Sequence, residues 1–145
     1  MEIVGGSGAS LHDLTIQNAD RWVIETASDT IFGYARLFDA PGQAVIATDV
    51  SGAILYWSRA AALLYGWREE EVLGANVVDI TPAVDMREDA EQIMARLRKG
   101  RGWSGEFTVQ RRDGTQVQVN VRDLPVRNSV GELIGVVGVS APLAG

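Results

Sequence analysis

The sequence contains no cysteine and only one histidine, His12. Without a thiol the chain cannot form a disulfide, supply a thiolate nucleophile or bind a metal through sulfur. A transition-metal site would need carboxylates alone, and no acidic cluster is expected to face an apolar interior. We therefore expect no metal site, and the absence of cysteine fits a reducing, cytoplasmic environment.

Long apolar runs and basic charge are also lacking. No stretch approaches the roughly 18–20 apolar residues of a membrane-spanning helix, so we expect no direct membrane contact. The net charge of −6 disfavours binding to nucleic acid, because phosphate backbones are bound by basic surfaces. The one basic cluster, residues 96–101, is interpreted as a cationic helix C-terminus.

The composition that remains is that of a single globular domain, with 145 residues, of which 46% are hydrophobic and 22% charged. Residues 1–38 are expected to form an N-terminal helical extension, and residues 39–142 the folded domain. An apolar stripe at helical spacing lies in the extension, made by Trp22, Ile31, Tyr34 and Phe38. It could cover the outer face of its own sheet, or pair with a second copy; we expect a homodimer through this segment.

Three apolar hairpins and one helical insertion predict the architecture. The hairpins span residues 43–57, 103–121 and 126–139, with turns on glycines such as Asp113-Gly114. Between the first two, residues 58–99 are expected to be helical, with Ser58 as a cap, Gly66 as a stop and the longest helix over 85–99. This order predicts an α+β fold: a five-stranded antiparallel sheet with helices covering one face, in which residues 43–57 pair beside residues 131–140.

A set of short motifs recurs in order over this region: DVSG at 49–52, ILYWSRAAALLYGW at 54–67, EVLG at 71–74, WSGE at 103–106, RDG at 112–114 and GVVGVS at 135–140. Together they resemble the PAS superfamily of sensor domains. The resemblance implies the PAS fold and a regulatory sensory or dimerisation module in a larger bacterial-type signalling protein, such as a two-component system. The output domain would lie elsewhere in the parent chain.

Strand alternation places Phe107 and Val109 on one face, opposite Val117, Val119 and Val121. In PAS domains this face lines the interior where a ligand sits when there is one. The candidate lining residues are Val77, Ile93, Met94, Leu97, Phe107, Val119, Val121 and Ser140. Because this interior is expected to be almost wholly aliphatic, it favours an apolar or weakly polar small molecule, or else a packed core with no ligand.

The resemblance also allows single residues of this chain to be compared with the cofactor-binding residues of the family. Flavin photosensors of the LOV type carry a reactive cysteine in the turn before the long helix, where this chain has Val77. Their flavin-binding asparagine and glutamine correspond to Val119 and Ser140, so we expect no LOV-type flavin; non-covalent redox-flavin binding stays open. Haem-binding relatives supply a histidine from the long helix, and residues 85–99 contain none.

An enzyme would need a nucleophile with a base, or a carboxylate in an apolar pocket. The best candidates are Asp79, Asp123 and Tyr65, and the sequence shows no partner for any of them. We therefore expect this segment not to be an enzyme. The leading hypothesis is the sensory module, the alternative a small-molecule-binding module in its own right, and the third a small enzyme.

Overall fold

The structure is a computed structural model that describes residues 27–143. Residues 27–37 are helical. The elements that follow are β1 (Ala44–Thr48), β2 (Ile54–Trp57), α2 (Arg59–Tyr65), α3 (Glu69–Val72), α4 (Val77–Ile80), the 3-10 turn η1 (Val84–Met86), α5 (Arg87–Arg98), β3 (Trp103–Gln110), β4 (Gln116–Arg127) and β5 (Leu133–Pro142). The expectations placed on Trp22 and His12 lie outside the described residues.

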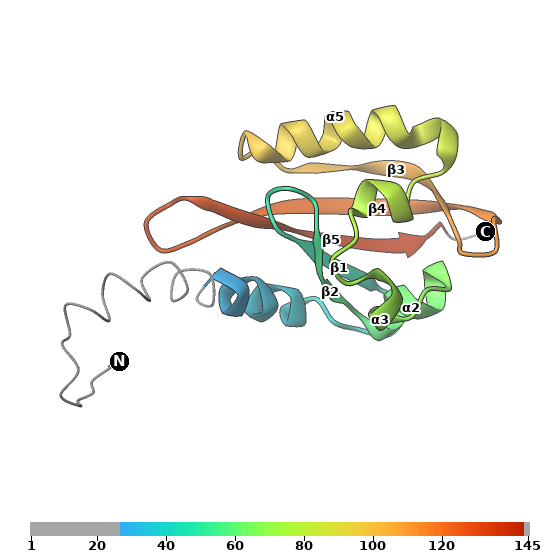
Figure 1. Ribbon diagram of the computed structural model, residues 1–145, viewed down its shortest axis with the longest axis horizontal. Coiled ribbons are helices and arrows are strands. Elements are labelled where there is room, and N and C mark those ends of the chain that lie inside the picture. The colour runs from blue at the N-terminus through green and yellow to red at the C-terminus, as the bar shows by residue number, and fades with distance from the viewer. Residues whose placement is uncertain (1–26, 144–145) are drawn as a thin grey trace.

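The strands form one antiparallel sheet in the order β2-β1-β5-β4-β3 (Figure 1). β1 lies beside β5, with Thr48 opposite Val136, as predicted for residues 43–57 and 131–140. In the β3–β4 hairpin Phe107 is opposite Val119, so the predicted alternation is confirmed. Gly114 takes a φ of 92° in the turn that joins these strands, a conformation that glycine adopts at little cost.

The helices between β2 and β3 form where the local sequence predicts them. The Ser58 hydroxyl accepts a hydrogen bond from the Ala61 amide at 3.1 Å and starts α2. Gly66 ends this helix in the left-handed conformation, with a φ of 79°. α5 begins two residues later than predicted, because Val84–Met86 forms a 3-10 turn, and it buries Met94 and Leu97.

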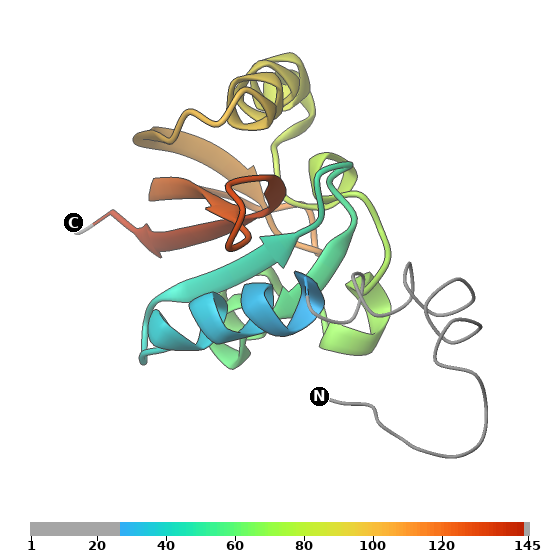
Figure 2. The same cartoon turned by 90° about the vertical axis from the view of Figure 1, so that its left-hand side faces the viewer.

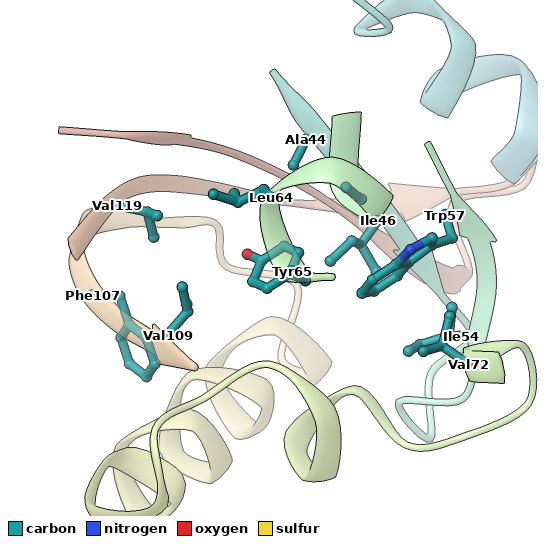
Figure 3. Packing of buried hydrophobic residues seen from close by; sticks show 11 residues of the cluster. Ala44, Ile46, Ile54, Trp57, Leu64, Tyr65, Val72, Phe107, Val109 and Val119 are labelled. Atoms are coloured by element: carbon teal, nitrogen blue, oxygen red, sulfur yellow. The ribbon is translucent and has the colours of Figure 1, made fainter. Parts of the chain in front are cut away.

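The inner face of the sheet, which α2 to α5 cover, holds the larger core. This core combines apolar side chains from β1, β2, β3 and β4 with α2, and Tyr65 lies among them (Figure 3). The Tyr65 ring lies 5.5 Å from the Trp57 ring, centroid to centroid. Successive strand residues point to opposite faces, so β1 contributes Ile46 to this inner core and Val45 to the outer one.

The helix of residues 27–37 covers the outer face. Ile31 and Ala35 are 1% and 0% exposed and pack with Val45 and Val137. Figure 2 shows this helix (blue) alongside β1 (teal). Ile31 therefore belongs to the chain's own core, and its assignment to an exposed dimer-forming stripe is wrong. Tyr34, by contrast, is 46% exposed, and Phe38 is half-buried.

Candidate functional site

A cavity of about 100 Å³ lies between the inner face of the sheet and helices α4 and α5; we call it the inner cavity. Most of the predicted lining residues surround it: Val77, Ile93, Met94, Phe107, Val121 and Ser140. Leu97 and Val119 do not line it; both are fully buried in the surrounding core. The walls are mainly apolar, since they come from core-facing positions of helices and strands.

Polar groups nevertheless reach the inner cavity, so the expectation of an almost wholly aliphatic interior is wrong. The hydroxyls of Tyr65 and Ser140 lie 3.1 Å apart and share a buried hydrogen bond. Burial raises the pKa of Tyr65 to about 12, so this hydroxyl stays neutral near pH 7. The pair closes one side of the cavity and connects α2 to β5.

Asp123 is the acidic side chain of the inner cavity. It follows Val121 by two residues on β4, and its Cα partners are Trp103 on β3 and Gly138 on β5. Its carboxylate occupies the space above Gly138, where an added Cβ would come within 2.6 Å of Oδ1. Within residues 27–143 it has no hydrogen bond or ion pair, and burial raises its pKa to about 7.

Two further features complete the chemistry of the inner cavity. Thr48 is buried at 3% exposure, and its hydroxyl has no hydrogen-bond partner among the described residues. Trp103 and Phe107 also line the cavity, with their rings edge to face at a centroid distance of 6.1 Å. The site therefore combines aromatic surface with unpaired oxygen atoms.

A surface depression adjoins the inner cavity and shares Trp103 and Asp123 with it. Arg96 and Arg122 also line this depression. The Arg96 Nε donates to the Gly102 carbonyl oxygen at 2.8 Å. Asp123 thus lies between the inner cavity and a basic, solvent-facing rim.

The three residues considered for catalysis do not form a catalytic arrangement. Asp79 is exposed and lies 3.9 Å from Arg87, away from the cavity. Tyr65 and Asp123 both line the cavity but share no hydrogen bond. Across residues 27–143, no group of three or more His, Asp or Glu side chains could hold a metal ion. Over the same range, no helix has both the length and the apolar character needed to cross a membrane.

The positions considered for cofactors differ in their surroundings. Val77 opens α4 after the Asn76 cap and lines the inner cavity, so an aliphatic group stands where the LOV thiol is expected. Val119 is fully buried, and Ser140 is engaged with Tyr65. α5 presents only aliphatic side chains and Met94 to the cavity.

Among the lining residues that the motif comparison missed, those with a polar or aromatic side chain are Thr48, Tyr65, Thr81, Trp103 and Asp123. The signal for Asp123 was present in the sequence, because Val117, Val119 and Val121 set a period of two that continues to position 123. Thr48 continues the same alternation from Ala44 and Ile46 on β1. Its place in the cavity wall also depends on the helices that pack over this face, which the alternation does not give.

A family model described as PAS fold matches residues 33–141. Among solved structures, a PAS domain from Colwellia psychrerythraea has a TM-score of 0.66 at 22% identity, covering 77% of this chain and 94% of that one. The PAS domain of an HTR-like protein from Haloarcula marismortui has a TM-score of 0.61 at 20% identity, covering 88% and 99%. A fungal LOV domain photoreceptor has a TM-score of 0.61 at 19% identity, covering 72% and 76%. These structures share the fold.

Proposed function

The chain belongs to the PAS family, and on that basis we propose that it is a regulatory module of a larger signal-transduction protein that senses a small molecule in its inner cavity. Domains of this family are generally sensory modules of signalling proteins and are typically not catalytic. The parent chain would carry the output domain, and ligand occupancy would be the signal.

The observation that supports ligand sensing is the inner cavity itself. Small-molecule sites are mostly apolar concavities with a few convergent polar groups. Here Ile93 and Val121 supply apolar wall, while Tyr65, Ser140 and Asp123 supply oxygen atoms. The elements around the cavity, α4, α5 and the inner face of the sheet, adjoin one another, so a bound molecule would contact several of them at once.

Aliphatic side chains at Val77 and along the cavity face of α5 argue against a covalently bound flavin and against an axially ligated haem. We propose instead a small organic ligand without metal. The cavity volume of about 100 Å³ is several times the roughly 10–15 Å³ that is needed to hold one water molecule. A ligand of that size is a small metabolite-like molecule.

Native mass spectrometry of the purified protein tests the proposal. We expect the chain to carry a non-covalent adduct, or to acquire one from a panel of small organic compounds. Ile93→Trp fills the cavity and should abolish the adduct. Val130→Trp is the matched control, because Val130 is 76% exposed and does not line the cavity. Equal adducts on both variants would contradict the proposal.

We also propose that the module acts as a homodimer through the solvent-facing side of the helix at residues 27–37. Tyr34 is 46% exposed and Leu37 is 78% exposed on this side, while Ile31 and Ala35 hold the helix to its own sheet. Adjacent exposed apolar side chains of this size are typical of an interaction site. Phe38 and Trp22, which follow and precede them in the predicted stripe, would extend the contact.

A further inference from the structure

Within the proposed sensory function, we infer that the inner cavity is a site for a small organic cation, an apolar molecule that carries one protonated amine. The inference rests on the proposed function, because it assigns the chemical class of the ligand. It is argued from the charge, the unpaired oxygens and the aromatic rings that line this cavity.

The charge of the lining has one sign. Asp123 is the acidic group among the lining residues of the described chain, and no Lys, Arg or His side chain lines the cavity. Tyr65 adds no charge, since its pKa lies near 12. A carboxylate without a counter-ion inside an apolar wall is costly unless a cation pairs with it. A ligand with an ammonium group would supply that cation.

The hydrogen-bonding inventory agrees with a donor-rich ligand. The Thr48 hydroxyl is buried without a hydrogen-bond partner among the described residues, and no described residue donates a hydrogen bond to the Asp123 carboxylate, which also borders the surface depression. An ammonium group offers three donors, and a carboxylate accepts such charge-assisted bonds more strongly than neutral ones. The space for the carboxylate depends on Gly138, whose missing Cβ leaves Oδ1 room.

The aromatic rings supply the second attraction. Trp103 is the cross-strand partner of Asp123, and Phe107 packs edge to face against Trp103. The faces of aromatic rings attract cations, with tryptophan the strongest, and several rings together are the usual site for organic ammonium groups. A carboxylate beside two rings therefore favours an organic cation over a bare metal ion, for which the described residues supply too few oxygen ligands.

Three other ionisable groups face Asp123: Tyr65 from α2 across the cavity, and Arg96 of α5 and Arg122 of β4 at the surface depression. Neither arginine forms an ion pair with Asp123 in the described chain, and Arg96 is engaged with the Gly102 carbonyl. Because only burial acts on Asp123, its carboxyl ionises as the pH rises through about 7. Binding of an amine should strengthen over the same range, since the amine stays protonated there.

Cyclohexylamine and cyclohexanol form a matched pair of probes, of nearly equal shape and different charge. In calorimetric titrations of the full chain we expect cyclohexylamine to bind at least about tenfold more tightly than cyclohexanol at pH 8. Asp123→Asn should remove this preference, so that the two probes bind with similar affinity. In the native chain, the affinity for cyclohexylamine should rise with pH through about 7, a measurement that needs no variant.

Equal affinities for the two probes, or a preference that survives Asp123→Asn, would overturn the cation assignment and leave the ligand-binding cavity in place. An affinity for cyclohexylamine that falls or stays flat through pH 7 would overturn it as well. Failure of both probes to bind would count against the cavity as a ligand site, and so against the proposed function itself. Ile93→Trp serves as the control that binding occurs in the inner cavity.

Discussion

The hydroxyls of Tyr65 and Ser140 lie 3.1 Å apart and connect residues separated by 75 positions in the chain. Tyr65 is the last residue of α2, and Ser140 lies on β5 opposite Ala44, the first residue of β1. A buried hydrogen bond between elements so far apart holds the α2 side of the inner cavity to the sheet.

Tyr65→Phe tests how much this contact contributes. The substitution leaves the Ser140 hydroxyl buried without its partner, so we expect a loss of about 1–2 kcal/mol in the free energy of unfolding. Tyr56→Phe is the matched control, because the Tyr56 hydroxyl donates to Asp39 in an exposed position, and it should cost less than about 0.5 kcal/mol. Urea denaturation of both variants gives the comparison. Equal losses would show that the buried pair has no special role.

Ile31→Ala tests the docking of the helix at residues 27–37. Ile31 is 1% exposed in the outer core, so the truncation should cost about 2–5 kcal/mol. Leu63→Ala on α2 removes a side chain that is 77% exposed and should change stability by less than about 0.5 kcal/mol. Thermal denaturation followed by circular dichroism separates the two cases. A small effect of Ile31→Ala would mean that the helix is not held to the sheet.

The pH dependence of stability should report on Asp123. Burial raises its pKa from 3.8 to about 7, so the folded state keeps a proton that the unfolded chain releases between those values. The protonated Asp123 carboxyl therefore contributes to the free energy of unfolding in full below about pH 4, its pKa in the unfolded chain. This contribution is lost as the pH rises through about 7, its pKa in the folded chain. Asp123→Asn should flatten this decline in a series of urea denaturation curves. The difference in unfolding free energy between the native chain and Asp123→Asn cancels the contribution of the other titrating groups. If this difference stayed constant from about pH 4 to pH 8, it would contradict the burial of the Asp123 carboxyl.

The proposed homodimer is tested on the exposed side of the helix. Tyr34→Glu and Trp22→Ala should each convert a dimer to a folded monomer in size-exclusion chromatography with light scattering, because large aromatics most often anchor such contacts. Glu106→Gln, an exposed change on the distant edge strand β3, is the control and should leave the dimer intact. A wild-type monomer, or a dimer unaffected by either helix variant, would rule out this interface.

Local sequence signals predicted much of the fold. The Ser58 cap, the Gly66 stop and the Asp113-Gly114 turn each depend on residues close in the chain, and all three form as predicted. The pairing of β1 with β5 followed from the motif order, because the resemblance carries the topology with it. These features need no knowledge of long-range packing.

The candidate site was harder to predict, because its polar residues come together only through tertiary packing. Asp123 lies opposite Trp103 and above Gly138, a neighbourhood set by two strand registers at once. Ile31 and Tyr34 share one helical stripe in the sequence, yet the first faces the sheet and the second faces solvent. An apolar stripe predicts an amphipathic helix, but only the packed structure shows which of its apolar residues contact the sheet and which remain exposed.

The central claim is that the inner cavity receives a small molecule, and an amide NMR titration with cyclohexanol tests it most directly. We predict shift changes concentrated on α4, α5 and the inner positions of β4 and β5, saturating with ligand and absent in Ile93→Trp, while Val130→Trp behaves like the native chain. No saturable shifts, or shifts that persist unchanged in Ile93→Trp, would contradict the claim.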